Sequence, residues 1–188
     1  MNTPAHAVIN LYLLRRNHGH LKTTAIVAGA VIPDLVIMVF YAWHLYLGTP
    51  EKQIWSTEYF NPHWQASIDI FNSIPIFIIA IVICVKLGKP VLIALFASLL
   101  LHALGDLPLH HDDAHRHFFP FLDWRFESPL SYWDPAHHGN LISLLEFTAV
   151  AAVSVFLWIK RRPLRPWIVI LVSIYLAYWV YVFNVWMP

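Results

Sequence analysis

The sequence predicts an all-α membrane protein that forms a single domain with about five transmembrane helices. Hydrophobic residues make up 59% of the 188 residues and charged residues only 12%, whereas soluble domains contain about 25% charged residues. The apolar residues are grouped into five long runs, and a helix needs about 20 mostly apolar residues to cross a bilayer. Basic residues gather between alternate runs, which is the pattern of cytoplasmic loops in membrane proteins.

The composition also excludes several classes of protein and site. Twelve basic and eleven acidic side chains give a formal net charge of +1, which leaves no basic surplus to neutralise a phosphate backbone, so no nucleic-acid partner is expected. The single cysteine, Cys84, excludes a disulfide framework and a thiolate metal site. Since the chain has twelve histidines, any metal ion would be held by nitrogen and oxygen ligands.

The first predicted element is a short N-terminal helix that does not span the membrane. Thr3 is a suitable N-cap and Pro4 a suitable first helical residue, and the stretch AHAVINLYLL makes about three turns. If the next helix runs antiparallel after a turn at Gly19, His6 reaches a depth similar to that of Asp34. A surface amphipathic helix with a solvated His6 is the alternative.

The five apolar runs follow as predicted spans, and the third is short for a bilayer. The last run has no charge and ends in aromatic residues suited to a membrane interface. Basic residues within 15–22, 86–89 and 160–165 predict a cytoplasmic N-terminus in the inner or plasma membrane of the cell and an extracytoplasmic loop at 107–139. The predicted spans of this single domain, 1–188, are 26–47, 68–87, 91–106, 140–159 and 167–187.

Histidines and acidic residues are concentrated between positions 102 and 138. This stretch holds seven of the twelve histidines and six of the eleven acidic residues. His102 and Asp106 are four residues apart at the end of the third predicted span, so they lie on one helix face and can share a metal ion. Ionisable groups in such helices are costly and usually functional. The alternative for the pair is a buried hydrogen-bonded pair without an ion, and the alternative for the whole stretch is a polar extracytoplasmic loop with hydrogen-bonded histidines.

Four further histidines occur in the loop sequence HHDDAHRH. If Asp112 or Asp113 caps a short helix there, pairs of these residues fall at i,i+4 spacing and complete a second set of ligands. We expect two or three of the four histidines to bind metal and the others to orient the ligands by hydrogen bonds. The four candidates are His110, His111, His115 and His117.

Two further signals come from either side of the loop. Asp134 and Pro135 predict the N-cap and first residue of the fourth span. His137 and His138 then lie in its first turn and face the same membrane surface as the third span. Asp34 follows a proline inside the first span, which indicates either a metal ligand or the partner of a histidine.

The remaining candidates have two interpretations each. Glu146 lies about two turns beyond His138, and we favour a supporting role for it over a role as ligand. Arg116 and Arg125 could act in catalysis, together with Asp106, by binding an anionic substrate group. The alternative for the two arginines is structural pairing with acidic residues of the loop, Asp123 or Glu127.

Taken in order along the chain, these residues resemble a known family. His6, the Pro33–Asp34 pair, the HxxxD motif at His102–Asp106 and the later histidine pair resemble the inner-membrane-associated metal-dependent hydrolases described as LexA-binding. The order is also distantly similar to the zinc-dependent phospholipase C and single-strand nuclease superfamily, which is all-helical with a multi-zinc phosphodiesterase site. The resemblance implies these metal ligands: His6, Asp34, His102, Asp106, one of His110 and His111, and one of His137 and His138.

The resemblance implies a membrane-bound hydrolase that cleaves a phosphoester of a lipid or lipid-linked substrate. We expect one or two divalent ions, zinc first and iron as the alternative, with Asp106 bridging a pair of ions that activates water. A di-iron membrane oxidase or hydroxylase is one alternative, and only the His111–His115 spacing matches its histidine boxes. A non-enzymatic metal-binding membrane protein is the other.

Overall fold

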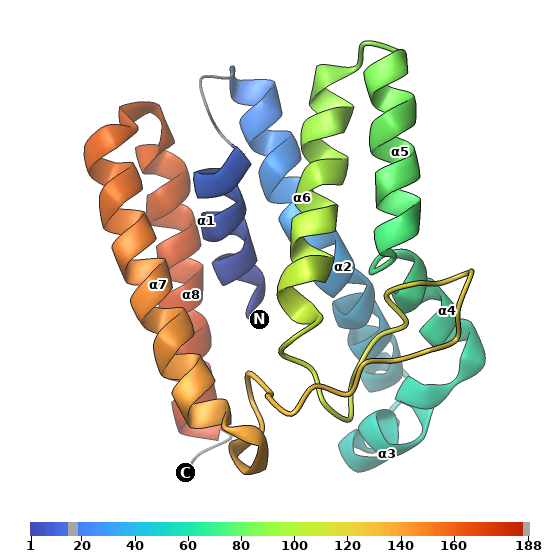
Figure 1. The fold of residues 1–188 in the computed structure, drawn as a ribbon. Coiled ribbons are helices and arrows are strands. Elements are labelled where there is room, and N and C mark those ends of the chain that lie inside the picture. The colour runs from blue at the N-terminus through green and yellow to red at the C-terminus, as the bar shows by residue number, and fades with distance from the viewer. Residues whose placement is uncertain (15–18, 186–188) are drawn as a thin grey trace.

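The computed structural model describes residues 1–14 and 19–185, and every regular element in this part of the chain is helical. The predicted all-α class is therefore confirmed. Six helices form an upright bundle (Figure 1). They are α1 (Thr3–Leu14), α2 (His20–Tyr46), α5 (Ile74–Lys86), α6 (Pro90–Asp106), α7 (Gly139–Lys160) and α8 (Arg165–Val185).

Shorter elements lie at the ends of the bundle. Two short helices, a 3₁₀ turn and the irregular segment 107–134 form a layer at the end where α6 finishes and α7 begins (Figure 1). A cluster of apolar side chains around Phe40 joins α2 to this layer. The short elements are α3 (Glu51–Ser56), η1 (Glu58–Phe60), α4 (Pro62–Ile70), η2 (Pro135–His137) and η3 (Arg162–Leu164).

The N-terminal helix α1 is the centre of the bundle. It packs between α2 and α6 on one side and α7 and α8 on the other (Figure 1). Its apolar face is fully buried at Ala5, Val8 and Leu11, which belong to the largest core cluster. With 12 residues the helix is too short to span a membrane, and its first turn lies inside the bundle.

Three helices, α2, α7 and α8, are long and apolar enough to cross a membrane, which is compatible with membrane insertion. The prediction of about five spans is not confirmed. The predicted span 68–87 is divided between α4 and α5, which are bent by 40° at their junction. The 17 residues of α6 make a helix of about 25 Å, shorter than a hydrocarbon core of about 30 Å. If α4 and α5 count as one bent span, the described residues contain up to four.

Pro75 explains why the second predicted span is broken. Proline has no N–H and its ring clashes with the carbonyl four residues earlier, so α4 cannot continue through it. Ser73 caps the new helix, since its hydroxyl accepts a hydrogen bond from Ile76 N at 3.3 Å. The N–H of Ile74 donates to the carbonyl of His117 at 2.9 Å. The histidine-rich segment is therefore attached to the bundle at this break.

The basic residues of the described chain lie mostly at one end of the bundle. Lys22, Lys86, Lys89 and Lys160 lie near the ends of α2, α5, α6 and α7, opposite the 107–134 segment (Figure 1). The orientation argument also used Arg15 and Arg16, which lie outside the described residues, as do positions 186 and 187 of the last predicted span. The sidedness of the protein stays a prediction.

Helices α2 and α6 pack closely at Gly29, and this contact predicts a measurable effect on stability. A Cβ at this position would lie 2.4 Å from the carbonyl oxygen of Leu95 and 2.8 Å from Ser98 Cβ. We expect Gly29→Ala to force the helices apart and to lower the free energy of unfolding by about 1–3 kcal/mol. Thermal unfolding of the full chain in detergent micelles measures the change.

Gly19 supplies the matched control for this prediction. It precedes the same helix, and a Cβ added there meets no atom within 4 Å. Gly19→Ala is expected to change the free energy of unfolding by less than about 0.5 kcal/mol. An equal loss of stability in the two variants would show that close packing of α2 on α6 is not the cause.

Candidate metal centre

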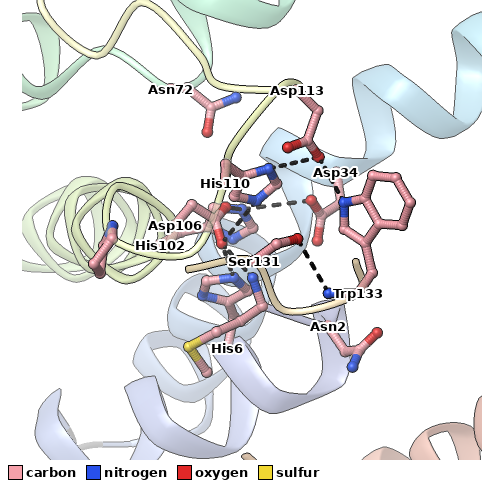
Figure 2. Close-up of polar contacts among 12 residues, drawn as sticks. Asn2, His6, Asp34, Asn72, His102, Asp106, His110, Asp113, Ser131 and Trp133 are labelled. Carbon is pink, nitrogen blue, oxygen red and sulfur yellow. Dashed lines mark hydrogen bonds and ion pairs between the residues drawn. The ribbon is translucent and has the colours of Figure 1, made fainter. Parts of the chain in front are cut away.

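Three buried side chains meet where α1 approaches the end of α6. The Nε2 atom of His6 lies 2.9 Å from Asp106 Oδ1, and the Nε2 atom of His102 lies 2.9 Å from Asp106 Oδ2. Figure 2 shows the two imidazoles converging on this one carboxylate. One ligand atom from each residue lies within 4.8 Å of the others. Such a group, two imidazole nitrogens and one carboxylate oxygen, could bind a metal ion.

The hydrogen bonding of His102 leaves its Nε2 atom free to bind a cation. Its Nδ1 donates to the carbonyl of Ala30 at 2.8 Å, so in the neutral ring the lone pair is on Nε2. Nε2 is buried and has no hydrogen-bond partner, although a carboxylate oxygen of Asp106 lies 2.9 Å away. A lone pair facing a carboxylate is unfavourable unless a proton or a metal ion lies between them. The residues therefore fit a bound cation.

Asp34 adds a second carboxylate to the same place. Its Oδ1 atom lies 3.5 Å from His102 Nε2, and its Oδ2 atom is buried without a hydrogen-bond partner. Figure 2 shows it entering from α2, across the site from His6. The predicted similarity in depth between His6 and Asp34 agrees with this placement. Four of the predicted ligands, His6, Asp34, His102 and Asp106, are thus brought together from three helices.

Close packing around His6 keeps its ring in place. The His6 and His102 rings stack with centroids 3.7 Å apart. Gly105 lies beneath the His6 ring, and a Cβ there would be only 3.2 Å from His6 Cε1. The amino group of Met1 lies 2.6 Å from Asp106 Oδ1, the same oxygen that His6 Nε2 approaches. The absence of a side chain at Gly105 therefore permits the approach of α1.

His110 is the loop histidine nearest to this cluster. Its Nε2 atom lies 3.5 Å from Asp106 Oδ1, and its Nδ1 donates to Asp113 Oδ2 at 2.8 Å. The same Asp113 oxygen accepts a hydrogen bond from the indole N–H of Trp133 at 3.2 Å. Burial lowers the pKa of His110, but the contacts with Asp106 and Asp113 outweigh burial and raise it to about 9. Asp113 therefore orients the ring so that Nε2 faces the cluster (Figure 2).

His115 and His117 are buried behind His110. The ring centroids of His110 and His115 are 5.0 Å apart, and those of His115 and His117 are 5.8 Å apart. Burial lowers the pKa of His115 to about 3, and the charges of His110 and His117 act in the same direction. His117 Nδ1 donates to the carbonyl of Asn72 at 3.0 Å. No contact among the described residues joins either ring to His6 or His102.

The loop does not contain the short helix that would have aligned its histidines. Residues 111–113 form turns, with the N–H of Ala114 bonded to the carbonyl of His111 at 3.3 Å. The expectation that Asp112 or Asp113 caps a helix is wrong, because the Asp113 side chain is used by His110. The i,i+4 argument for a second ligand set from this segment therefore fails.

His111 and His137 form a separate stacked pair with ring centroids 3.7 Å apart. His111 Nδ1 donates to the carbonyl of Ser128 at 2.7 Å, and His137 Nδ1 to Asp134 Oδ2 at 2.6 Å. Among the described residues, no hydrogen bond or ring contact joins this pair to His6, His102 or Asp106. Their role as metal ligands stays a prediction that this geometry does not support.

The start of α7 differs from the prediction. Asp134 is an N-cap, as expected, but it caps the 3₁₀ turn η2, and α7 begins only at Gly139. His138 joins the two with a left-handed backbone, φ 64°, and its side chain is exposed. A Cβ at Gly139 would lie 2.6 Å from the carbonyl oxygen of Asp134. This sharp junction directs His137 and His138 away from the first turn of the long helix, where we expected them.

The two predicted catalytic arginines pair with a residue that the sequence did not indicate, Asp69 of α4. Arg116 donates to Asp69 through its backbone N at 2.9 Å and through Nε at 2.6 Å, and to Asp123 through Nη1 at 2.7 Å. Arg125 donates to the Ala114 carbonyl at 2.6 Å and lies 3.9 Å from Asp69. The Arg116–Asp123 contact matches the structural alternative, whereas no ion pair among the described residues joins Arg125 to Asp123 or Glu127. Substrate binding by the arginines stays a prediction.

Glu146 lies outside the cluster, on α7, and accepts hydrogen bonds from Asn2 and Tyr175. The sequence did not indicate either partner, since each is only a polar residue in or beside an apolar helix.

Comparisons with protein-family models, with curated proteins and with solved structures find no match for this chain.

Proposed function

We propose that this chain is a membrane-bound, metal-dependent hydrolase that cleaves a phosphoester of a lipid or lipid-linked substrate. One observation carries the proposal: the unpartnered, buried Nε2 of His102 faces the carboxylates of Asp34 and Asp106. Ionisable groups buried among apolar helices are costly and usually functional. The ligand types present are those of catalytic zinc sites.

The depth of the cluster supports a lipid-borne substrate. Counted from Pro90 at the start of α6, His102 lies about 18 Å and Asp106 about 24 Å along the helix. If the basic helix ends lie at one membrane surface, the cluster lies within the hydrocarbon layer of about 30 Å, close to the opposite surface. A phosphoester held at the headgroup level lies within a few ångströms of that position. By the charge pattern, this is the extracytoplasmic surface.

The residues of the cluster have separate roles in the proposed metal-dependent hydrolysis. A divalent ion, when bound, lowers the pKa of a coordinated water towards about 7. His6, His102, Asp106 and Asp34 would hold the ion, and Ala30 fixes the ring of His102 through its carbonyl. His110 presents Nε2 to the same carboxylate, and its raised pKa of about 9 keeps the ring protonated there near neutral pH.

The distribution of buried polar residues favours an enzyme over a transport path. In the described chain, the buried histidine, aspartate and glutamate side chains lie at the level of His102 or towards the 107–134 layer. Towards the basic end the buried polar residues are Asn10, Thr23, Ser98 and Ser154, which carry no charge. A metal transporter would need ligands along the whole path.

The ligand set also favours a second candidate function. Two imidazoles and one carboxylate are the protein ligands of non-haem iron oxygenases as well as of some zinc hydrolases. His6, His102 and Asp106 are such a set. An iron-dependent membrane oxidase or hydroxylase is therefore the alternative to hydrolysis.

Metal content and activity of the purified full chain together test the proposal. We expect stoichiometric zinc in the wild type by elemental analysis, and loss of that zinc in His102→Ala. We also expect zinc-dependent release of water-soluble phosphorus from vesicles of phosphatidylethanolamine and phosphatidylglycerol. Iron with a visible absorption spectrum would support the oxidase instead. Hydrolysis that persists in His102→Ala would overturn the proposed site.

A further inference from the structure

Glu146 is a buried carboxylate in the middle of α7 that the proposed chemistry does not use. Its side chain is largely inaccessible, and the residue is 6% exposed. Its oxygens accept three hydrogen bonds, from Asn2 N at 3.0 Å, Asn2 Nδ2 at 2.6 Å and the Tyr175 hydroxyl at 2.9 Å. Two of the three donors belong to one residue, at the start of α1. Glu146 therefore fixes the position of Asn2.

Asn2 in turn fixes the backbone of His6. Its carbonyl accepts the N–H of Ala5 at 2.9 Å and the N–H of His6 at 3.2 Å, which are the first backbone hydrogen bonds at the start of α1. The first N–H groups of a helix have no partner within the helix, and a negative charge beside them is favourable. The contacts thus form a continuous path from Glu146 through Asn2 to His6.

The position of His6 tolerates little displacement. Its ring is stacked on His102 with centroids 3.7 Å apart and lies against Gly105. Ligand residues of a metal site must be held to within about 0.5 Å. Since α1 has only three turns and begins inside the bundle (Figure 1), Glu146 and Tyr175 provide the polar contacts that tie its first residues to α7 and α8.

We propose that Glu146 is a positioning residue that holds His6 in the metal centre through Asn2. The inference rests on the metal centre of the proposed function and assigns Glu146 no ligand role, because its two carboxylate oxygens are engaged by Asn2 and Tyr175. Partners that contact a ligand directly typically change metal affinity by 10–100-fold when they are replaced, and Glu146 acts one contact further away, through Asn2.

Zinc affinity of the full chain in detergent micelles, measured by competition with a chelating dye, is the first test. We expect Glu146→Gln to raise the zinc dissociation constant by about 10-fold, the low end of the range for residues that contact a ligand directly. In a His6→Ala background the same substitution should have almost no further effect, because coupled residues are not additive. An unchanged dissociation constant in Glu146→Gln, or an equal drop in affinity in both backgrounds, would overturn the inference.

Ser154→Ala is the matched control on the same helix. Ser154 lies two turns further along α7, is buried, and has a hydroxyl without a hydrogen-bond partner. We expect its replacement to leave zinc affinity at the wild-type value. A loss equal to that of Glu146→Gln would show that any disturbance of α7 affects the site, which contradicts a specific path through Asn2.

A second measurement separates this inference from the proposed function. Spin labels at Tyr12 on α1 and Leu104 on α6, both exposed, report the distance between the two helices without metal, in a Cys84→Ala background. We expect a narrow distribution in the parent and a broader or shifted one with Glu146→Gln. If the wild type binds no zinc, the proposed function fails. If the distance distribution is unchanged by Glu146→Gln, the positioning role fails.

Discussion

Asp106→Asn is expected to weaken zinc binding by the full chain by more than about 100-fold. The carboxylate contacts both candidate imidazole ligands at 2.9 Å, and an amide cannot supply the negative charge that a divalent ion requires. The expected loss exceeds the 10–100-fold effect of replacing a residue that only supports a ligand. A competition titration with a zinc-binding dye measures it.

Asp112→Asn is the control for this substitution. Asp112 is exposed in the adjacent loop, so the change in chemistry is the same but no candidate ligand is affected. Its zinc affinity should equal that of the wild type. If Asp106→Asn retained wild-type affinity and stoichiometry, the ion would have to be bound elsewhere in the protein.

Asp69→Asn is expected to give the largest loss of stability. Its fully buried carboxylate accepts two hydrogen bonds from Arg116 and lies near Arg125. Without the charge, both guanidinium groups lose their common partner and the loop loses its link to α4. We expect the free energy of unfolding to fall by about 3 kcal/mol, the low end for a broken buried ion pair, because the arginines are partly exposed.

Denaturant unfolding of the full chain in mixed micelles measures this loss, with Asp123→Asn as the control. Asp123 is the other carboxylate bonded to Arg116, but its side chain is 91% exposed. An exposed pair contributes less than about 1 kcal/mol. Similar losses in the two variants would mean that burial of Asp69 does not determine the strength of the pairing.

The candidate site could be predicted where its geometry is local. His102 and Asp106 lie on one face because they are four residues apart in a helix, and the structure has them there. The depth argument for His6 and Asp34 also agrees with the structure, since it depends only on a turn between two helices and the rise per residue. The ligand types for a metal ion followed from the histidine content and the single cysteine.

The loop could not be predicted in the same way. Spacing treated its four histidines as equivalent, but their hydrogen bonds differ. The partner is Asp113 for His110, the Ser128 carbonyl for His111 and the Asn72 carbonyl for His117, whereas Nδ1 of His115 is buried without one. These partners are up to 45 residues away in the sequence. A segment without regular secondary structure has no repeating pattern of side-chain directions, so residue spacing cannot predict such contacts.

The span count differed for a similar reason. The apolar run 68–87 satisfies a hydropathy criterion as one helix, yet Pro75 and the Ser73 cap divide it. A mean hydropathy over the whole run does not register single residues, such as Ser73 and Pro75, that determine where a helix ends. The bend of 40° between α4 and α5 then determines where the loop is attached.

The sequence by itself determined the helical class, the apolar character of the long helices and the HxxxD pair, because each depends on residues within a few turns of one another. Only the tertiary structure decided that His6 and Asp34 meet this pair, that Asp69 holds the two arginines, and that Glu146 holds Asn2. The physical reason is that a buried charge is stable only beside its partner, and partners from different helices meet only when those helices pack.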